Sequence, residues 1–180
     1  PTVPLLWMQN LRDEQIKWPL PHFKKPQYLE VCSAIESKLI SVQNYVLLRR
    51  FSSKEEKKRV QAFPFLASQF SRYKTIGFEN HLNYIFKENR LMTVEEVNGI
   101  SALLNSQIID TYYRTLSGNT QINSSDLNHL PVPSLNIINN KHETHDILHG
   151  IVSKFNEQDI KFFVDDWMNI NNNYSSFPDY

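Results

Sequence analysis

"NYVLLRRFSSKEEKKRVQAFPFLA", residues 44–67, places two apolar runs on either side of a polar stretch. The first run occupies residues 45–48, and the second returns within residues 58–67. Between them, residues 52–57 ("SSKEEK") have the composition of an exposed turn. Two strand-like runs joined in this way predict a long β-hairpin, with positive charge gathered near its tip.

Short strands and turns are predicted for most of the first 90 residues. Apolar residues alternate after a polar turn at residues 12–14, which predicts a second hairpin within residues 10–20. Residues 81–86 ("HLNYIF") alternate in the same way and predict a further strand, whereas residues 33–39 favour a short helix. Prolines indicate loops or strand edges at positions 19, 21 and 26.

A helical period begins at Thr93. Thr93 and Glu96 have the spacing of a capping box, in which each side chain hydrogen-bonds a free backbone N–H group at the start of a helix. An apolar stripe with helical spacing follows at Val97, Ile100, Leu104, Ile108, Tyr112 and Leu116. Gly118 stands where a left-handed residue commonly ends a helix. The pattern predicts one long helix over residues 93–117.

The patterns together predict an α/β (α+β) fold. A twisted, mostly antiparallel sheet lobe would occupy residues 1–92, followed by the long helix 93–117 and a polar, turn-rich segment at 118–139. We expect this last segment to act as a structural latch. Residues 140–180 would form a helical C-terminal tail. The apolar spacing in that tail predicts two helices, 142–155 and 157–170.

The formal net charge is zero, but the two halves of the chain differ strongly. Residues 1–90 carry 15 Lys and Arg against 8 Asp and Glu, a balance of +7, and residues 91–180 carry 4 against 11, a balance of −7. Between residues 38 and 74 there are nine basic residues and two acidic ones. This excess favours an anionic partner for the first half. The alternative is a solvated hairpin whose lysines protect sheet edges.

Known catalytic patterns match the sequence poorly. His142, His145 and His149 could face one metal ion from a helix, but the glutamate base of helical zinc proteases is missing from their spacing. Glu36-Ser37-Lys38 is half of a nuclease motif without its upstream acid. The four glycines are too far apart to form a phosphate-binding loop. The residues therefore favour a binding module over an enzyme, with no catalytic or metal-binding residue.

The remaining composition restricts the compartment. No run of about 18 apolar residues is present, so no membrane span is expected. The single cysteine, Cys32, excludes an internal disulfide framework and fits a reducing cytosol. The chain starts at Pro1 without an initiator Met or a signal pattern, which indicates a part of a longer protein.

Four segments together resemble the adenine-specific DNA methyltransferases of bacterial type II restriction–modification systems. The similarity is to their C-terminal target recognition domain, which reads the DNA sequence to be methylated. The segments are "NYVLLRRFSSKEEKKRV" (44–60), "IGFENHLNYI" (76–85), "LLNSQIIDTYYRTLSGNTQIN" (103–123) and "DLNHLPVPSL" (126–135). The stretch from "SGNTQIN" to "LPVP" is also similar to the specificity subunits of type I restriction systems.

The resemblance implies that residues 1–139 form a DNA target recognition domain with double-stranded DNA as its partner, in a bacterial cytoplasm. These methyltransferases bind S-adenosylmethionine with a glycine-containing loop and hold the flipped adenine with an Asn/Asp-Pro-Pro-aromatic motif. Here no two of the nine prolines are adjacent, and no Gly-x-Gly occurs. S-adenosylmethionine is therefore expected in a catalytic domain of the same parent polypeptide. Alone, the chain is expected to be inactive.

Under this resemblance, the basic segment would contact DNA. The candidate residues are Arg49, Arg50, Lys54, Lys57, Lys58, Arg59, Arg72, Tyr73 and Lys74. Most of the cations would contact phosphates, and one or two arginines would read guanine edges in the major groove. Asn80 and His81 are weaker candidates for base or sugar contacts.

Two alternatives stay open. The apolar stripe of the long helix 93–117 could bind a protein partner, as in the specificity subunits, instead of covering its own sheet. In the latch, Leu127, Leu130 and Val132 are expected to dock on the sheet or the helix, whereas Asn119, Thr120 and Gln121 are the alternative candidates for DNA contact.

Overall fold

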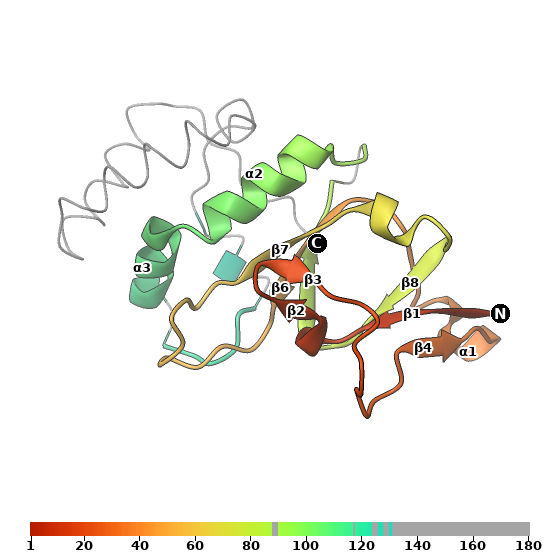
Figure 1. The fold of residues 1–180 in the computed structure, drawn as a ribbon. Helices are drawn as coiled ribbons and strands as arrows, with labels where there is room; N and C mark the ends of the chain where they lie inside the picture. The colour runs from red at the N-terminus through yellow and green to blue at the C-terminus, as the bar shows by residue number, and fades with distance from the viewer. Residues whose placement is uncertain (88–89, 117, 124–125, 128–129, 131–180) are drawn as a thin grey trace.

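The computed structural model describes residues 1–130, apart from 88–89, 117, 124–125 and 128–129 (Figure 1). The predicted tail 140–180, its histidine cluster and Val132 of the predicted latch lie outside these residues. The elements in chain order are β1 (Thr2–Leu6), η1 (Met8–Asn10), β2 (Leu11–Arg12), β3 (Gln15–Ile16), β4 (Tyr28–Glu30), α1 (Ser33–Glu36), β5 (Ile40–Ser41), β6 (Tyr45–Arg49), β7 (Ala62–Phe65), η2 (Ala67–Phe70), β8 (Thr75–Phe78), β9 (Leu82–Ile85), α2 (Val94–Leu104) and α3 (Gln107–Leu116).

The described strands form three sheets, with the strand orders β4-β1-β8-β5, β2-β3 and β7-β6-β9. Their neighbours pair antiparallel except β1 and β8, which run in parallel. The predicted α+β class with mostly antiparallel strands is confirmed, although the strands divide among three sheets instead of forming one. The hairpin predicted at residues 44–67 is β6–β7, in register from Tyr45 opposite Phe65 to Leu48 opposite Ala62.

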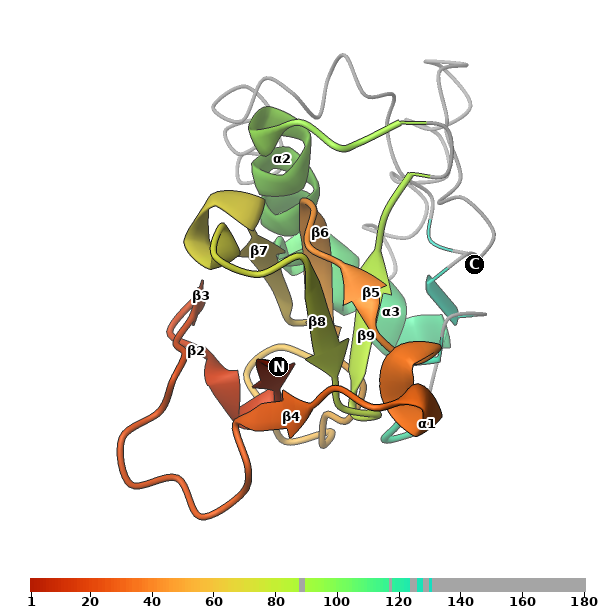
Figure 2. The ribbon, with the colours of Figure 1, turned by 90° about the vertical axis from the view of Figure 1, so that its right-hand side faces the viewer.

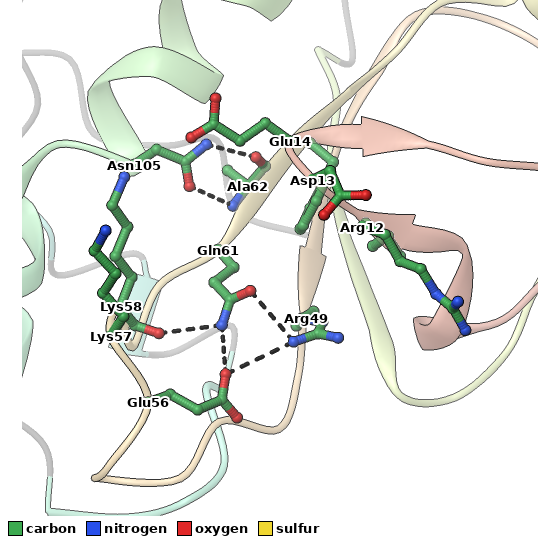
Figure 3. Close-up of a pocket in the computed structure, with 12 residues that line it drawn as sticks. Arg12, Asp13, Glu14, Arg49, Glu56, Lys57, Lys58, Gln61, Ala62 and Asn105 are labelled. Carbon is green, nitrogen blue, oxygen red and sulfur yellow. Dashed lines mark hydrogen bonds and ion pairs between the residues drawn. The ribbon is translucent and has the colours of Figure 1, made fainter.

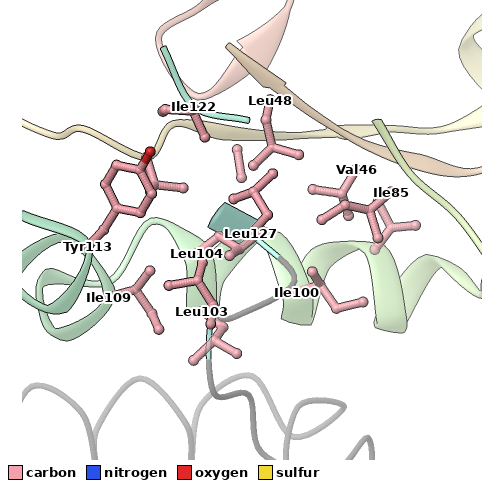
Figure 4. Close-up of a cluster of buried hydrophobic side chains, with 14 of the residues drawn as sticks. Val46, Leu48, Ile85, Ile100, Leu103, Leu104, Ile109, Tyr113, Ile122 and Leu127 are labelled. Carbon is pink, nitrogen blue, oxygen red and sulfur yellow. The ribbon is translucent and has the colours of Figure 1, made fainter. Parts of the chain in front are cut away.

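The sheet β7-β6-β9 is buried on both faces, which explains the unbroken apolar run at the start of the hairpin. Because successive side chains of a strand point to opposite faces, Val46 and Leu48 pack with α2 and α3, whereas Tyr45 and Leu47 pack with side chains such as Leu6. Figure 4 shows the first of these two clusters. In Figure 1, α2 and α3 lie on one side of the β6–β7 hairpin and β1, β4 and β8 lie on the other.

The other short elements follow the sequence closely. The hairpin predicted within residues 10–20 is β2–β3, with Asp13 and Glu14 at positive φ in its two-residue turn. The strand predicted at 81–86 is β9, and the short helix predicted at 33–39 is α1, which ends at Glu36. Figure 2 shows β4, α1 and the loop that joins β3 to β4 at the lower end of the molecule.

The predicted single helix 93–117 is wrong, because Asn105 and Ser106 divide it into α2 and α3. The Asn105 side chain accepts a hydrogen bond from Ala62 N (2.9 Å) and donates one to Ala62 O (2.6 Å), which covers the outer edge of β7. Ser106 Oγ accepts from Ile109 N (3.4 Å) at the start of α3. Asn and Ser side chains compete with helical hydrogen bonds in this way and favour helix ends.

The apolar stripe of the two helices is used inside the molecule. Val97, Ile100, Leu104 and Ile108 belong to one buried cluster with β6 and β9, and each is at most 4% exposed. Binding of a protein partner through this stripe would require exposed side chains, and these four are buried within the fold.

The predicted capping box is confirmed at the start of α2. Thr93 Oγ1 accepts from Glu96 N (3.2 Å), and Glu96 Oε2 accepts from Thr93 N (3.0 Å). Lys87 and Arg90 also donate to the buried Glu96 carboxylate, and the hydrogen bond from Arg90 is the main reason why its pKa falls to about 2.

The described part of the predicted latch packs against the hairpin and the helices. Leu127 and Leu130 are buried in the same cluster as α2 and α3, as predicted. The prediction of a left-handed backbone at Gly118 is wrong, because no described glycine has a positive φ. The chain instead runs from Gly118 into a strand-like pairing, in which Ser52 N donates to Thr120 O (3.0 Å) and Ile122 N donates to Arg50 O (2.8 Å).

Candidate nucleic-acid interface

Residues 50–61, here called the basic loop, connect β6 to β7 and carry most of the predicted DNA-contacting side chains. Lys54 and Lys57 are exposed, and Arg50 and Lys58 are half-buried. Arg50 Nη1 donates to Asn80 O (3.2 Å), and Arg50 N donates to His81 O (2.9 Å), so the start of the loop is joined to the β8–β9 turn. The four cations thus lie on one connection of the sheet, whose first residue is fixed to that turn.

A pocket of about 510 Å³ lies between the basic loop and the β2–β3 turn (Figure 3). Its lining residues are Leu11, Arg12, Asp13, Glu14, Arg49, Glu56, Lys57, Lys58, Gln61, Ala62, Phe63 and Asn105. Arg49 Nη1 lies 3.3 Å from Gln61 Oε1 and 3.6 Å from Glu56 Oε2, and Gln61 Nε2 donates to Glu56 Oε2 (2.5 Å). The wall therefore combines cations, carboxylates and an amide, and Arg49 is paired there with an acid.

Arg59 does not belong to this surface, which corrects its predicted role. Its side chain is buried, with 2% of the residue exposed, because α3 covers the end of the basic loop. The Arg59 guanidinium donates to Asn119 O, and its Cζ lies 5.6 Å from the centroid of the Tyr113 ring. Arg59 thus joins the loop, α3 and the latch, and it is a buried structural cation.

Arg72, Tyr73 and Lys74 lie at the other end of the hairpin. They precede β8, and Lys74 O accepts from Val42 N (2.9 Å) near the beginning of β6, whereas the basic loop follows the end of β6. Arg72 and Lys74 are exposed, but Tyr73 is half-buried with its ring at an edge-to-face angle to Trp18, at 6.0 Å between centroids. The structure does not bring these three residues together with the basic loop.

The latch reaches the basic loop at residues 118–121. A Cβ atom added at Gly118 would lie 3.8 Å from Lys54 Nζ, and Asn119 and Thr120 are exposed beside it. Gln121 forms an antiparallel bridge with Phe51. The segment thus pairs with the start of the basic loop, and its exposed residues border the same surface as Lys54.

Two residues of α3 that the sequence analysis did not single out hold the basic loop. Arg114 donates to the carbonyl oxygens of Lys54 and Glu56, and Asp110 accepts from Arg59 N. In the sequence they show only an Asp–Arg pair four residues apart, which is typical of a solvated helix face. The one signal was their position inside a segment that resembles the recognition domains.

The part of the chain that the structure describes contains no cluster of three or more His, Cys, Asp or Glu side chains that could hold a metal ion. Among the same residues, no helix has the length and apolar character needed to cross a lipid bilayer. Cys32 is a free, exposed thiol.

Comparison with known proteins places the chain near two methyltransferases. It is 36% identical over 136 residues to the type II methyltransferase M.PstI of Providencia stuartii, which covers 74% of this chain and 26% of that relative. It is 34% identical over 137 residues to the type II methyltransferase M.BsuBI of Bacillus subtilis, covering 76% and 27%. The chain is homologous to part of each enzyme. It spans about a quarter of the length of these relatives. No protein-family model and no solved structure matches it.

Proposed function

We propose that this chain is the sequence-specific DNA-binding, target-recognition part of a type II DNA methyltransferase that modifies adenine at N6. The observation that carries the proposal is the basic loop, which presents Arg50, Lys54, Lys57 and Lys58 together on one connection of a chain homologous to type II methyltransferases. Clustered cations of this kind neutralise the phosphates of a DNA duplex and position the protein on it.

Within the proposal, direct base reading belongs to the pocket beside the loop. Arg49 and Gln61 carry the side-chain types that bind the edges of guanine and adenine in pairs of hydrogen bonds. In the structure, Arg49 and Gln61 hydrogen-bond each other, Gln61 also hydrogen-bonds Glu56, and Arg49 forms an ion pair with Glu56. On binding DNA, they would exchange those partners for base edges.

Binding of the methyl donor is assigned to a part of the parent polypeptide outside this chain. The four glycines at positions 77, 99, 118 and 150 are too far apart to form a donor-binding loop. S-adenosylmethionine would therefore be bound by a catalytic domain of the same parent polypeptide, which would also extrude the target adenine from the duplex. The residues of this chain would hold the duplex in register for that step.

The first test is fluorescence anisotropy of the chain with a random-sequence duplex, from about 50 to 300 mM salt. Each phosphate contact steepens the fall of log affinity against log salt by about 0.9. We expect the double variant Lys54→Gln, Lys57→Gln to weaken DNA binding. It should also reduce the slope of log affinity against log salt by the contribution of up to about two phosphate contacts. The matched control, Lys24→Gln with Lys38→Gln, removes two exposed lysines outside the basic loop and should leave the slope unchanged.

A folded wild-type chain that does not bind DNA at the lowest salt would contradict the proposal. Sequence specificity is tested next by selection from a randomised duplex pool, where recovery of no common motif would contradict the recognition role. The adenine assignment is tested on the parent enzyme, by mass spectrometry of nucleosides from methylated DNA. Methylcytosine there would overturn that assignment alone.

A further inference from the structure

We propose that Arg114 of α3, oriented by Asp110, is a positioning residue that shapes the basic loop before DNA binds. The inference rests on the proposed DNA-binding function, since it concerns the same loop. Its basis is a set of hydrogen bonds from one guanidinium to the loop backbone. Arg114 Nη1 donates to Lys54 O (2.9 Å), and Nη2 donates to Glu56 O (2.8 Å) and lies 3.5 Å from Lys57 O.

Asp110 holds the other side of this arrangement. Its Oδ2 accepts from Arg114 Nε at 2.7 Å, and its Oδ1 accepts from the backbone N–H of Arg59. The side chain of Asp110 is 11% exposed and that of Arg114 is 30% exposed, so solvent competes little for the first and moderately for the second. The two residues together contact the backbone of the loop at positions 54, 56, 57 and 59.

These contacts determine which groups of the basic loop face α3 and which face solvent. The carbonyl oxygens of Lys54, Glu56 and Lys57 point toward Arg114, while the side chains of Lys54 and Lys57 are exposed. A twelve-residue loop without such contacts would sample many conformations, and ordering it on DNA would reduce the affinity. A planar guanidinium suits the role, because its donors fan out in one plane toward several acceptors.

A direct phosphate contact by Arg114 is the competing explanation, and the salt dependence separates the two. Loss of a phosphate contact reduces the slope of log affinity against log salt by about 0.9. Loss of preorganisation lowers the affinity while the bound complex keeps the same phosphate contacts, so the slope stays the same.

The experiment compares the wild-type chain with Arg114→Ala, Arg114→Lys and Asp110→Asn. Hydrogen exchange of the free proteins is measured by mass spectrometry, and DNA affinity is measured by anisotropy across the same salt range. For Arg114→Ala we expect faster exchange of the amides at residues 53–59, unchanged exchange in β6 and β9, and about tenfold weaker DNA binding, since ordering one or two more residues costs that much. The slope should not change.

Two controls and the conservative variant complete the test. Thr115→Ala alters an exposed α3 residue whose hydroxyl bonds only its own helix at Tyr112 O, and it should change neither readout. Lys38→Ala removes one exposed positive charge outside the loop and measures the effect of net charge on DNA affinity. Arg114→Lys keeps the charge but offers one ammonium in place of the planar fork, so exchange and affinity should lie between those of the wild type and Arg114→Ala.

Unchanged loop exchange and unchanged affinity in Arg114→Ala would overturn the inference. A slope reduced by about 0.9 with unchanged loop exchange would assign Arg114 to a phosphate instead. If Arg114→Ala does not fold, Asp110→Asn and Arg114→Lys still report loop exchange. Absence of DNA binding by the folded wild type would contradict the proposed function, while the exchange data would continue to decide whether Arg114 shapes the loop.

Discussion

Glu96 binds three nearby residues through one carboxylate. It closes the capping box of α2 with Thr93, and it accepts hydrogen bonds from Lys87 Nζ (2.9 Å) and Arg90 Nη1 (2.8 Å). The residue is 2% exposed, and the hydrogen bond from Arg90 is the largest contribution that lowers its pKa from 4.5 to about 2. The carboxylate is therefore ionised at every pH at which the fold is expected to be used.

Glu96→Gln should lower the free energy of unfolding by about 2 kcal/mol at pH 7, because the amide cannot replace a carboxylate paired with two cations. The folded pKa lies below the ordinary value, so the stabilisation by Glu96 is complete above pH 4.5 and is lost as the pH falls toward about 2. Urea unfolding of both proteins between pH 7 and 3 should show the difference shrinking in that window. Glu95→Gln, at the exposed neighbouring position, should cost only a few tenths of a kcal/mol.

At the scale of elements, the break between α2 and α3 depends on a contact that is distant in sequence. The apolar period continues through the break, and only the Asn105-Ser106 pair signals a helix end. Because the helix is interrupted there, the Asn105 side chain can hydrogen-bond the backbone N–H and C=O groups of Ala62 at the outer edge of β7. The capping box and the β6–β7 hairpin could be predicted because their signals are local, whereas the break follows from tertiary contact.

Asn105→Ala should destabilise the fold by about 1–2 kcal/mol, because two hydrogen bonds at the edge of β7 are lost together. Thermal or urea unfolding measures the effect. Asn98→Ala, a half-buried asparagine of α2, is the matched control. Equal effects of the two substitutions would show that the edge contact contributes nothing of its own.

The latch should contribute to stability through its buried side chains. Leu127 is 1% exposed in the cluster with α2 and α3, so Leu127→Ala should cost about 2–4 kcal/mol from lost burial and the cavity that remains. Val94→Ala changes an apolar residue that is 43% exposed and should cost much less. Similar urea midpoints for the two variants would mean that the latch is not docked in solution.

For the whole molecule, the basic excess of the first half is divided between two ends of one hairpin. The sequence located the cations, but it could not show that Arg59 turns inward under α3 or that Arg72 and Lys74 lie at the opposite end from Lys54. Both facts follow from how the helices and β8 pack on the central sheet. The role of Arg114 could not be predicted from the sequence for the same reason, since the residues it contacts are 57 to 60 positions away.

This division predicts unequal effects on DNA binding. The double variant Arg72→Gln, Lys74→Gln should reduce the salt slope less than Lys54→Gln, Lys57→Gln, although both remove two positive charges. Anisotropy titrations at matched salt concentrations measure the two slopes. Equal reductions would mean that the duplex contacts both ends of the hairpin, and they would extend the interface to Arg72 and Lys74.

Because Arg114 and Asp110 hold the basic loop through its backbone atoms, the amino acids at its exposed positions can change during evolution. Arg114 and Asp110 contact carbonyl oxygens and one N–H group, which almost every amino acid offers alike. The exposed side chains at positions 54 and 57 can therefore be exchanged without loosening these contacts, whereas the Glu56 side chain binds Ser53 N and Gln61 within the loop. A new preference could arise by substitution at these exposed positions alone, so the same frame would accept a loop of equal length that keeps Glu56 and Arg59.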